Sequence, residues 1–328
     1  MIEKPAHREG IRSDLLVEGR MTLPRVAILL AVHNGERFLW EQIASLASQS
    51  WPEIDVWASD DGSTDGSAAI LLRAATGWRK GSFRTLKGPG NGFAENFRSL
   101  ITNPEIHADT YAFCDQDDVW MADKLQTAIG WLGQQDAARP CVFCSRTRIT
   151  NSAGEAIGLS PLFSKPPAFR NAIVQSIAGG NTMVMNQSAR KILAEASRRT
   201  GFVTHDWWTY MVITGAGGTV HYAATPLVNY RQHGANMVGE NNSWRARWMR
   251  IRLMRAGRFS EWSAFNLAAL RACDDLLSPD AREVVGRFAA ARSGSLSRRI
   301  AALVRSGAYR QTKFGQIGLW VACLLGKL

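Results

Sequence analysis

The chain has 328 residues, of which 46% are hydrophobic, and it carries 39 Lys and Arg against 28 Asp and Glu, a net charge of +11. This length fits one large domain or one domain with an added module, and the hydrophobic fraction is normal for a globular protein. No run of about 18 or more apolar residues occurs, which excludes a strong transmembrane candidate.

The positive charge is concentrated at the C-terminal end. Residues 240–328 hold 16 basic and 6 acidic side chains, a net charge of +10, while residues 1–239 hold 23 and 22 and are nearly balanced. This distribution indicates a neutral catalytic or binding domain with a basic tail. A basic tail favours an anionic partner such as a membrane surface or a nucleic acid.

The first 23 residues are polar and lack the apolar central region of a signal peptide, so we expect a disordered leader over 1–23. Next comes a continuous apolar run, RVAILLAV, which is typical of a strand buried on both faces. From there the pattern of strand, polar loop and helix alternates four times, which predicts a parallel sheet with helices on both faces. The expected strands are 25–32, 54–59, 82–88 and 110–114, and the expected helices are 38–47, from about 66 through 72, 93–100 and 121–132.

Three polar loops follow strands of this predicted sheet: residues 33–35, 60–65 and 115–118. In open α/β sheets ligands bind beyond the carboxyl ends of the strands, so we expect these loops to line one crevice. There is no G-x-G-x-x-G after the first strand and no Walker lysine, so dinucleotide and P-loop interpretations lack their anchor.

The loop DQDD places three carboxylates, Asp115, Asp117 and Asp118, in four positions. Such clustering is costly unless a cation lies among the carboxylates, and Mg²⁺ and Mn²⁺ prefer oxygen ligands. The alternative is a solvated acidic loop with a helix N-cap. The apolar residues on both sides of the loop argue against that alternative.

The earlier loop SDDGSTDG has two interpretations. Its residues are ordinary turn formers, and Ser63 or Thr64 could simply cap the next helix. Alternatively, one of its carboxylates accepts the ring N–H of uracil or thymine and thereby selects the base.

The pair Cys141 and Cys144 has C-x-x-C spacing, but no second pair or histidine cluster completes a zinc site. The stretch also has strand character, so we expect buried free thiols. Five cysteines in a chain of this size fit a reducing compartment.

Together these stretches resemble the inverting family-2 glycosyltransferases of GT-A fold. The matching segments are VAILLAVHNGERFLWEQIASLASQS, DVWASDDGSTDGS, FCDQDDVWMADKL, GGNTMVMN and HDWWTYMVITGAGGTVHYAATPLVNYRQHGANMVG, which lie in order between about residues 24 and 240. The combination DQDDVW…DKL, HDWW and YRQHGANMVG looks most like a rhamnosyltransferase-like branch that builds bacterial surface polysaccharides.

The resemblance implies a site made of several groups of residues. Asp206 is the implied catalytic base, which deprotonates the acceptor hydroxyl and must come within about 3 Å of it. The implied nucleotide-binding residues are Ala31, His33, Asn34, Asp60, Asp61, Asn91, Gly92, Asp115 and Gln116. The implied metal ligands are Asp117, Asp115 and His233, and the implied sugar-binding residues are Asp118, Gly180, Asn181 and His205.

Two of these roles have structural alternatives, and two positions depart from the family. HDWW could merely start a buried helix with Asp206 as its N-cap, and His233 could be a structural histidine rather than a metal or diphosphate contact. The family often has Tyr at the position of His33, which puts the details of base binding in doubt. The Q-x-x-R-W motif of processive synthases is absent, which favours a transferase that adds a single sugar.

The basic tail contains two stretches that suit a membrane surface. Residues 243–258 hold six arginines and two tryptophans, and on a helix Trp244, Trp248 and Ile251 would form a stripe that Arg255 interrupts. Residues 315–326 form an uncharged run too short to span a bilayer but able to dip into its interface. The alternative is an ordinary helical subdomain. Nucleic acid is not expected as a partner, because no recognised nucleic-acid motif is present.

The sequence thus predicts a GT-A domain over 24–240 and a helical, basic, membrane-associated region over 241–328. We expect an enzyme that transfers a sugar, with L-rhamnose one candidate, from a dTDP- or UDP-sugar to a lipid-linked or saccharide acceptor with the help of Mn²⁺ or Mg²⁺. We expect it in the cytoplasm, at the inner face of the cytoplasmic membrane. The alternatives are a sugar-nucleotide nucleotidyltransferase, which usually has a Gly-rich basic loop after its first strand, and a non-catalytic membrane- or polymer-binding module.

Overall fold

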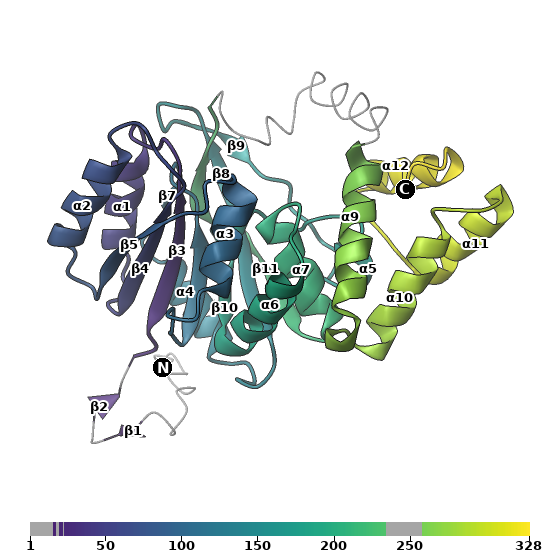
Figure 1. Cartoon of the computed structure of the whole chain (residues 1–328), viewed down its shortest axis with the longest axis horizontal. Coiled ribbons are helices and arrows are strands. Elements are labelled where there is room, and N and C mark those ends of the chain that lie inside the picture. The colour runs from purple at the N-terminus through teal and green to yellow at the C-terminus, as the bar shows by residue number, and fades with distance from the viewer. Residues whose placement is uncertain (1–15, 18–19, 22, 234–257) are drawn as a thin grey trace, which may run out of the picture.

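The computed structural model of the protein describes residues 16–17, 20–21, 23–233 and 258–328. Within these residues a nine-stranded mixed sheet carries helices on both faces, and a group of helices extends beyond one end of the sheet (Figure 1). The strand order is β5-β4-β3-β6-β10-β8-β11-β7, with β9 paired to β8. The predicted α/β fold with a mostly parallel sheet is therefore confirmed.

The first half of the sheet is the predicted parallel unit. Strands β5, β4, β3 and β6 pair in parallel, and each is followed by a loop at its carboxyl end. The sequence pattern had indicated that the second helix ends at Leu72, but in the structure this helix continues to Gly77. The bounds are β3 Val26–Val32, α1 Leu39–Ala47, β4 Ile54–Asp60, α2 Ser67–Gly77, β5 Phe83–Lys87, α3 Phe93–Thr102 and β6 Thr110–Cys114.

The second half of the sheet is mixed. Strand β10 runs antiparallel to both β6 and β8, while β8 and β11 are parallel to each other, and β7 and β9 are short antiparallel additions. The bounds are β7 Val119–Trp120, α4 Lys124–Leu132, β8 Cys141–Thr150, β9 Ala156–Leu159, α5 Phe169–Ala172, a 3₁₀ helix η2 Gly180–Thr182, β10 Val184–Asn186, α6 Gln187–Arg199, α7 His205–Gly215 and β11 Thr219–Arg231.

Alternation along the central strands supplies both faces of the core. On β3, Ala27 and Leu29 point to one face, which α3, α6 and α7 cover, and Ile28 and Leu30 point to the other, which α1, α2 and α4 cover. All four side chains are fully buried. This two-sided burial explains why the strand reads as a continuous apolar run.

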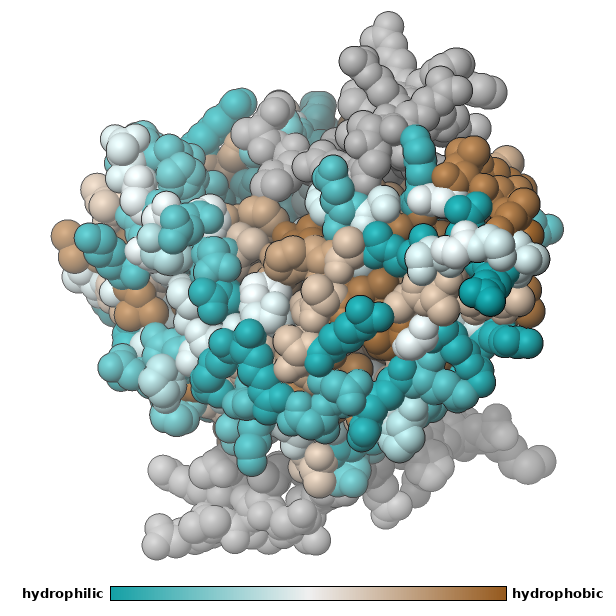
Figure 2. All heavy atoms as spheres, turned by 45° about the vertical axis from the view of Figure 1, so that its right-hand side comes forward, coloured by the Kyte–Doolittle hydropathy of each residue, from teal (hydrophilic) through white to brown (hydrophobic). Residues whose placement is uncertain are grey.

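The C-terminal region is helical, as predicted. It contains α9 Arg258–Ala272, a 3₁₀ helix Asp274–Leu276, α10 Pro279–Ala290, α11 Leu296–Ser306 and α12 Lys313–Leu324. Apolar side chains gather on the surface at the far end of this region (Figure 2). Across the parts of the chain that the structure describes, no helix is both long and apolar enough to traverse a bilayer.

Two sequence predictions fall mainly on segments outside the described residues. One is the amphipathic helix over 243–258, of which only Arg258, the first residue of α9, is described. The other is the disordered leader over 1–23. Within it, β1 Leu16–Val17 and β2 Arg20–Met21 form a short antiparallel pair.

The cysteines are buried free thiols, as predicted. Cys141 and Cys144 both lie on β8 and make no disulfide. Burial raises the pKa of each of the five thiols, most strongly those of Cys114 and Cys144. The five are Cys114, Cys141, Cys144, Cys273 and Cys323.

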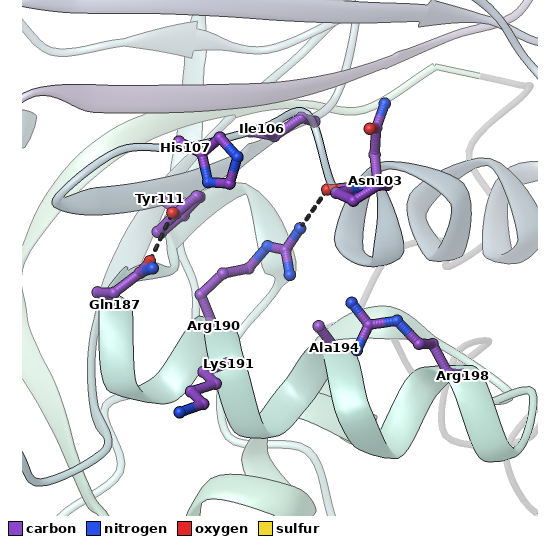
Figure 3. A pocket seen from close by; sticks show the side chains of 10 residues that line it. Asn103, Ile106, His107, Tyr111, Gln187, Arg190, Lys191, Ala194 and Arg198 are labelled. Atoms are coloured by element: carbon purple, nitrogen blue, oxygen red, sulfur yellow. Dashed lines mark hydrogen bonds between the residues drawn. The ribbon is translucent and has the colours of Figure 1, made fainter.

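A shallow hollow lies beside the amino-terminal end of β6, away from the polar loops (Figure 3). Arg190 of α6 reaches across it and donates hydrogen bonds to the carbonyl oxygens of Leu100 and Asn103 at the end of α3, each at 3.3 Å. Tyr111 donates to Gln187 on the same side. Because Arg190 caps carbonyls at the end of a helix, this hollow has a structural explanation.

Candidate active site at the carboxyl edge of the sheet

The three predicted loops meet at the carboxyl edge of the parallel strands. Strand register places Val32 opposite Asp60 and Leu30 opposite Cys114, so the loops that follow β3, β4 and β6 leave the sheet side by side. A side-chain amide joins two of them directly. Gln116 accepts a hydrogen bond from His33 N at 2.7 Å and donates one to His33 O at 2.9 Å.

The loops after β3 and β4 are also tied together. Asn34 adopts a positive φ of 49°, accepts a hydrogen bond from Thr64 N and donates its backbone N–H to the Ser63 hydroxyl. Asp60 accepts a hydrogen bond from Ser63 N at 2.9 Å. Ser63 and Thr64 therefore bind the neighbouring loop rather than cap α2, whose N-cap is Gly66. The capping interpretation of these two residues is wrong.

Asp61 positions the glycine-rich loop that follows β5. Its carboxylate is buried and accepts hydrogen bonds from Gly90 N at 2.6 Å and Gly92 N at 2.8 Å. Asn91, between these two glycines, is exposed at the tip of the loop. Asp61 thus orders a loop that carries two of the predicted nucleotide contacts. Ala31 lies half-buried near the end of β3.

The acidic cluster after β6 contains three carboxylates in different environments. Asp117 is bonded to His233, with 2.8 Å between Asp117 Oδ2 and His233 Nε2. Asp118 is fully enclosed and accepts hydrogen bonds from Asn181 Nδ2 and Arg231 N. Asp115 precedes both in sequence and is half-buried. The structure therefore brings together five of the predicted residues: Asp115, Asp117, Asp118, Asn181 and His233.

The cluster is electrostatically crowded. Burial, followed by the charge of Asp117, raises the pKa of Asp118 to about 7. Burial, followed by the charges of Asp118, Asp117 and Asp206, raises the pKa of Asp115 well above its usual range. Both shifts mean that keeping these carboxylates ionised costs free energy, and a bound cation would lower that cost.

Lys124, which the sequence analysis did not single out, is the buried cation behind this cluster. Its ammonium donates to the carbonyl oxygen of Asn181 at 2.6 Å and lies 2.9 Å from the ring centroid of Trp120. Burial lowers the pKa of Lys124 well below its usual range, although Asp118 and Asp115 oppose this shift. The segment DKL was part of the resemblance, but only the fold reveals that this lysine faces inward.

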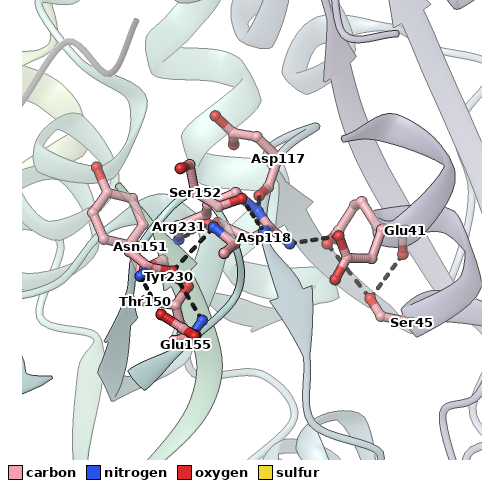
Figure 4. A network of polar contacts seen from close by, with 12 residues as sticks. Glu41, Ser45, Asp117, Asp118, Thr150, Asn151, Ser152, Glu155, Tyr230 and Arg231 are labelled. Carbon is pink, nitrogen blue, oxygen red and sulfur yellow. Dashed lines mark hydrogen bonds and ion pairs between the residues drawn. The ribbon is translucent and has the colours of Figure 1, made fainter. Parts of the chain in front are cut away.

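Arg231 at the end of β11 is the second residue that sequence reasoning missed. Figure 4 shows its guanidinium at the centre of a polar network that also includes Glu41 of α1 and the loop around Ser152. It donates to Glu41 Oε2 at 2.6 Å, to Asp117 O at 3.1 Å and to Ser152 O at 3.1 Å. Its backbone N–H also donates to Asp118, so one residue fixes the two adjacent aspartates at the carboxyl end of the acidic loop.

Asp206 lies in the first turn of α7, whose N-cap is Thr204. The N-cap interpretation of Asp206 is therefore wrong, although the segment does begin a buried helix. Its Oδ2 accepts a hydrogen bond from the Ser176 hydroxyl at 3.1 Å. Its neighbour His205 packs against Gly180, and the residue after that glycine, Asn181, is bonded to Asp118, so the start of α7 lies beside the acidic cluster. The charge of Asp206 is one of those that raise the pKa of Asp115.

His205 is buried against Phe97, with 3.7 Å between their ring centroids. Burial lowers the pKa of His205 to about 4, so the imidazole is neutral near pH 7. Neither ring nitrogen has a hydrogen-bond partner in the described part of the chain. A Cβ on Gly180 would overlap Nε2 of His205, which explains a glycine at this position of η2.

A divalent cation would fit this site only if part of its ligands came from a bound diphosphate and water. Over residues 23–233 and 258–328, no three or more His, Cys, Asp or Glu side chains form a complete metal site, so Asp115, Asp117 and His233 do not form one by themselves. Mg²⁺ commonly takes one or two carboxylates and obtains its other ligands from phosphates and water. The Asp117–His233 pair, beside crowded carboxylates, fits a cation that shares its coordination with a diphosphate.

Comparison with known proteins gives this arrangement a context. Residues 27–193 match the family described as Glycosyl transferase family 2. The dTDP-rhamnosyl transferase RfbG of Shigella flexneri is 26% identical over 239 residues, which cover 69% of this chain and 79% of that protein. An uncharacterized glycosyltransferase of Haemophilus influenzae is 30% identical over 115 residues, or 35% of this chain and 44% of that protein.

Solved structures share the fold. A crystal structure of S. aureus TarS 1-349 in complex with UDP-GlcNAc superimposes with a TM-score of 0.54 at 12% identity, over 92% of this chain and 81% of that one. The complex of the same protein with UDP gives a TM-score of 0.51 at 15% identity, over 92% and 80%. Both agree with the sheet and helix arrangement described above.

Proposed function

Because the chain belongs to glycosyl transferase family 2, we propose that it is an inverting, metal-dependent hexosyltransferase. It moves one sugar from a nucleoside-diphosphate donor to a lipid-linked or saccharide acceptor during synthesis of a surface polysaccharide. The observation that carries the proposal is the meeting of Asp60, the Asp115–Asp118 cluster and Asp206 at one edge of the sheet.

We favour L-rhamnose as the sugar and dTDP or UDP as the carrier. The support is the similarity to a protein named a dTDP-rhamnosyl transferase and the fold shared with a protein crystallised with UDP-GlcNAc. We place the enzyme in the cytoplasm, peripheral at the inner face of the cytoplasmic membrane, where a lipid-linked acceptor would be available.

The donor nucleotide lies against the loops that follow β3, β4 and β5. Asp60 accepts the ring N–H of a uracil or thymine base, and His33 forms the wall of the base pocket. Asp61 acts indirectly, because both of its oxygens already hold the N–H groups of Gly90 and Gly92. It keeps Asn91 and the loop in place beside the nucleotide.

The diphosphate lies over the acidic cluster. Asp117 and His233, with Asp115 nearby, would hold Mn²⁺ or Mg²⁺, which when bound neutralises charge on the leaving diphosphate. Asp118 and Asn181 lie behind the donor sugar. Both oxygens of Asp118 already accept hydrogen bonds, from Asn181 and from Arg231 N, so Asp118 acts by holding Asn181 in place. Lys124 and Arg231 hold this cluster from behind, through Asn181 O and through the backbone of Asp117 and Asp118.

Asp206 takes the proton from the acceptor hydroxyl. The acceptor oxygen then attacks the anomeric carbon as the bond from that carbon to the diphosphate oxygen breaks, so the configuration inverts and the nucleoside diphosphate leaves. The hydrogen bond from Ser176 orients Asp206 Oδ2.

Calorimetry with a panel of nucleoside diphosphates tests the donor site. We expect UDP or dTDP to bind with Mn²⁺ or Mg²⁺ and to lose affinity when EDTA is added, with the preferred base naming the donor class. Asp117→Ala should abolish the effect of the metal, while Asp123→Asn, an exposed carboxylate on the adjacent turn, should leave it unchanged. Absence of binding by every nucleotide would contradict the proposal.

Release of nucleoside diphosphate in the presence of acceptor tests the base. Asp206→Asn should lower kcat by about 10²–10⁴-fold, the usual contribution of general base catalysis, while nucleotide affinity stays at the wild-type value. Ser176→Ala should give a smaller loss, since it removes one orienting hydrogen bond. Full turnover by Asp206→Asn would remove Asp206 from the mechanism.

A further inference from the structure

Helix α12 has apolar side chains on both of its sides. Leu319, Ala322 and Cys323 are buried against the neighbouring helices. On the opposite side, Ile317 is 58% exposed and Leu324 is 50% exposed. A helix that is apolar all round is normally covered on all sides, so this exposed stripe calls for an apolar partner.

Neighbouring residues extend the stripe into a surface. Val321 and Leu325 of α12 are exposed beside Ile317 and Leu324, and Val304 of α11 is exposed as well. Arg299 of α11 donates a hydrogen bond to Leu324 O at 3.0 Å, which fixes the two helices together. Figure 2 shows apolar side chains gathered at this end of the molecule. We call the exposed Ile317, Val321, Leu324 and Leu325 the apolar face.

The charge around the apolar face has one sign. Residues 291–328 contain seven Arg and Lys and no Asp or Glu. Arg298 and Arg305 of α11 are exposed, as are Lys313, the first residue of α12, and Lys327, three residues after its end. No charged residue lies between Lys313 and Lys327, so the apolar stripe is continuous and bordered by cations.

This pattern separates the two possible partners. A second copy of the chain, paired face to face through α12, would bring these cations against the same cations of its partner. An anionic bilayer instead offers hydrocarbon to the apolar face and phosphate groups to its basic border. The observations therefore favour lipid.

We propose that the apolar face of α12 docks the protein on an anionic membrane, with Ile317, Val321 and Leu324 entering the interface. Figure 1 shows α12 beyond the sheet at the upper right, among the C-terminal helices. Docking would serve sugar transfer only if the acceptor is lipid-linked, so that consequence rests on the proposed function.

Flotation of the full chain with vesicles tests the docking surface. We expect binding to vesicles of equal parts phosphatidylcholine and phosphatidylglycerol, and much weaker binding to phosphatidylcholine alone. The double variant I317S/L324S should partition at least about tenfold less well, because it removes two apolar anchors. The control is L72S on α2, where Leu72 is 71% exposed and equally apolar, and which should bind as wild type does.

A second pair of variants keeps the test decisive. L325S alters the same face with a single exchange, and R298Q/R305Q should weaken binding only to the anionic vesicles. Wild-type binding by I317S/L324S, or no vesicle binding by the wild type, would overturn the proposal. A concentration-dependent dimer that I317S/L324S abolishes, without vesicle binding, would assign the face to a second copy. Calorimetric binding of UDP or dTDP without vesicles reports separately on the sugar-transfer proposal.

Discussion

The contact between Gly180 and His205 makes a glycine necessary at one position of the site. Gly180→Ala would drive its Cβ into an imidazole that is packed on Phe97 and has little room to move. We expect a loss of about 1–3 kcal/mol of unfolding free energy, the usual cost of overpacking. Urea denaturation of both proteins measures the difference.

A second glycine provides the matched control. Gly130 lies on the exposed side of α4, and a Cβ there meets no atom within 4 Å. Gly130→Ala should therefore stabilise the protein by about 0.5–1 kcal/mol, because alanine loses less backbone entropy in a helix. Equal effects of the two exchanges would show that the His205 contact is not tight.

Asp118 should give the ligand-free protein a characteristic dependence on pH. Its folded pKa of about 7 lies above the value of about 3.9 for an unfolded aspartate, so between these values the folded state holds a proton that the unfolded state has lost. The unfolding free energy that Asp118 contributes must then fall as pH rises from about 4 to about 7, by an amount on the order of 2–4 kcal/mol.

Comparison with Asp118→Asn isolates this contribution, since His205 and the other titrating groups remain in both proteins. The wild-type stability minus that of the variant should decrease across the same pH window and level off above it. Thermal melts at a series of pH values measure this difference. A constant difference would mean that Asp118 stays ionised in the folded protein.

Residue identity alone revealed the acidic residues of the site but not the cations behind them. Asp115, Asp117 and Asp118 stand together in the sequence, so their pattern was visible. Lys124 and Arg231 act through Asn181 and Glu41, which are 57 and 190 residues away. No local pattern reports contacts over such separations.

At the scale of elements, β11 connects the acidic loop to the rest of the fold through Arg231. Arg231→Lys keeps the charge but cannot reproduce the fork that reaches Asp117 O, Ser152 O and Glu41. We expect a loss of about 2–3 kcal/mol, since hydrogen bonds from a buried charged group are among the stronger ones. Chemical denaturation measures the loss, and nucleotide affinity should fall with it.

Glu41→Gln is the control on the other side of this ion pair. The Glu41 side chain is more than half exposed, so its contribution should stay within about 1 kcal/mol. A loss as large as that of Arg231→Lys would mean that the ion pair, rather than the contacts to the backbone, holds the loop.

The sequence predicted the long elements better than the short ones. Strand β3 was visible because seven consecutive residues are apolar and the strand is covered on both faces. Strands β7 and β10 have two and three residues, and their pairing depends on β11, β6 and β8 rather than on their own composition. The antiparallel half of the sheet was therefore not specified by local pattern.

At the scale of the whole molecule, the C-terminal helices share a core with the sheet. The side chain of Leu277 lies beside Gly215 at the end of α7, and Ser278 N donates to Gly215 O at 2.8 Å. Arg170 of α5 makes a two-pronged ion pair with Asp280 of α10. One apolar cluster extends from Phe113 of β6 to Leu319 of α12.

The full chain should therefore unfold in one cooperative transition, and a fragment that ends at residue 240 should be markedly less stable. Circular dichroism and tryptophan fluorescence during urea denaturation should give coincident curves for the full chain. Two separated transitions would instead support independent units that divide near residue 240, as the change of charge along the sequence suggested.

The burial of all five thiols has a practical consequence for labelling chemistry. Maleimides react with thiolates, and burial both encloses these sulfurs and keeps them protonated. The native cysteines should therefore remain silent in the folded protein. A single cysteine introduced at an exposed position would carry a fluorophore or spin label without any need to remove the others first.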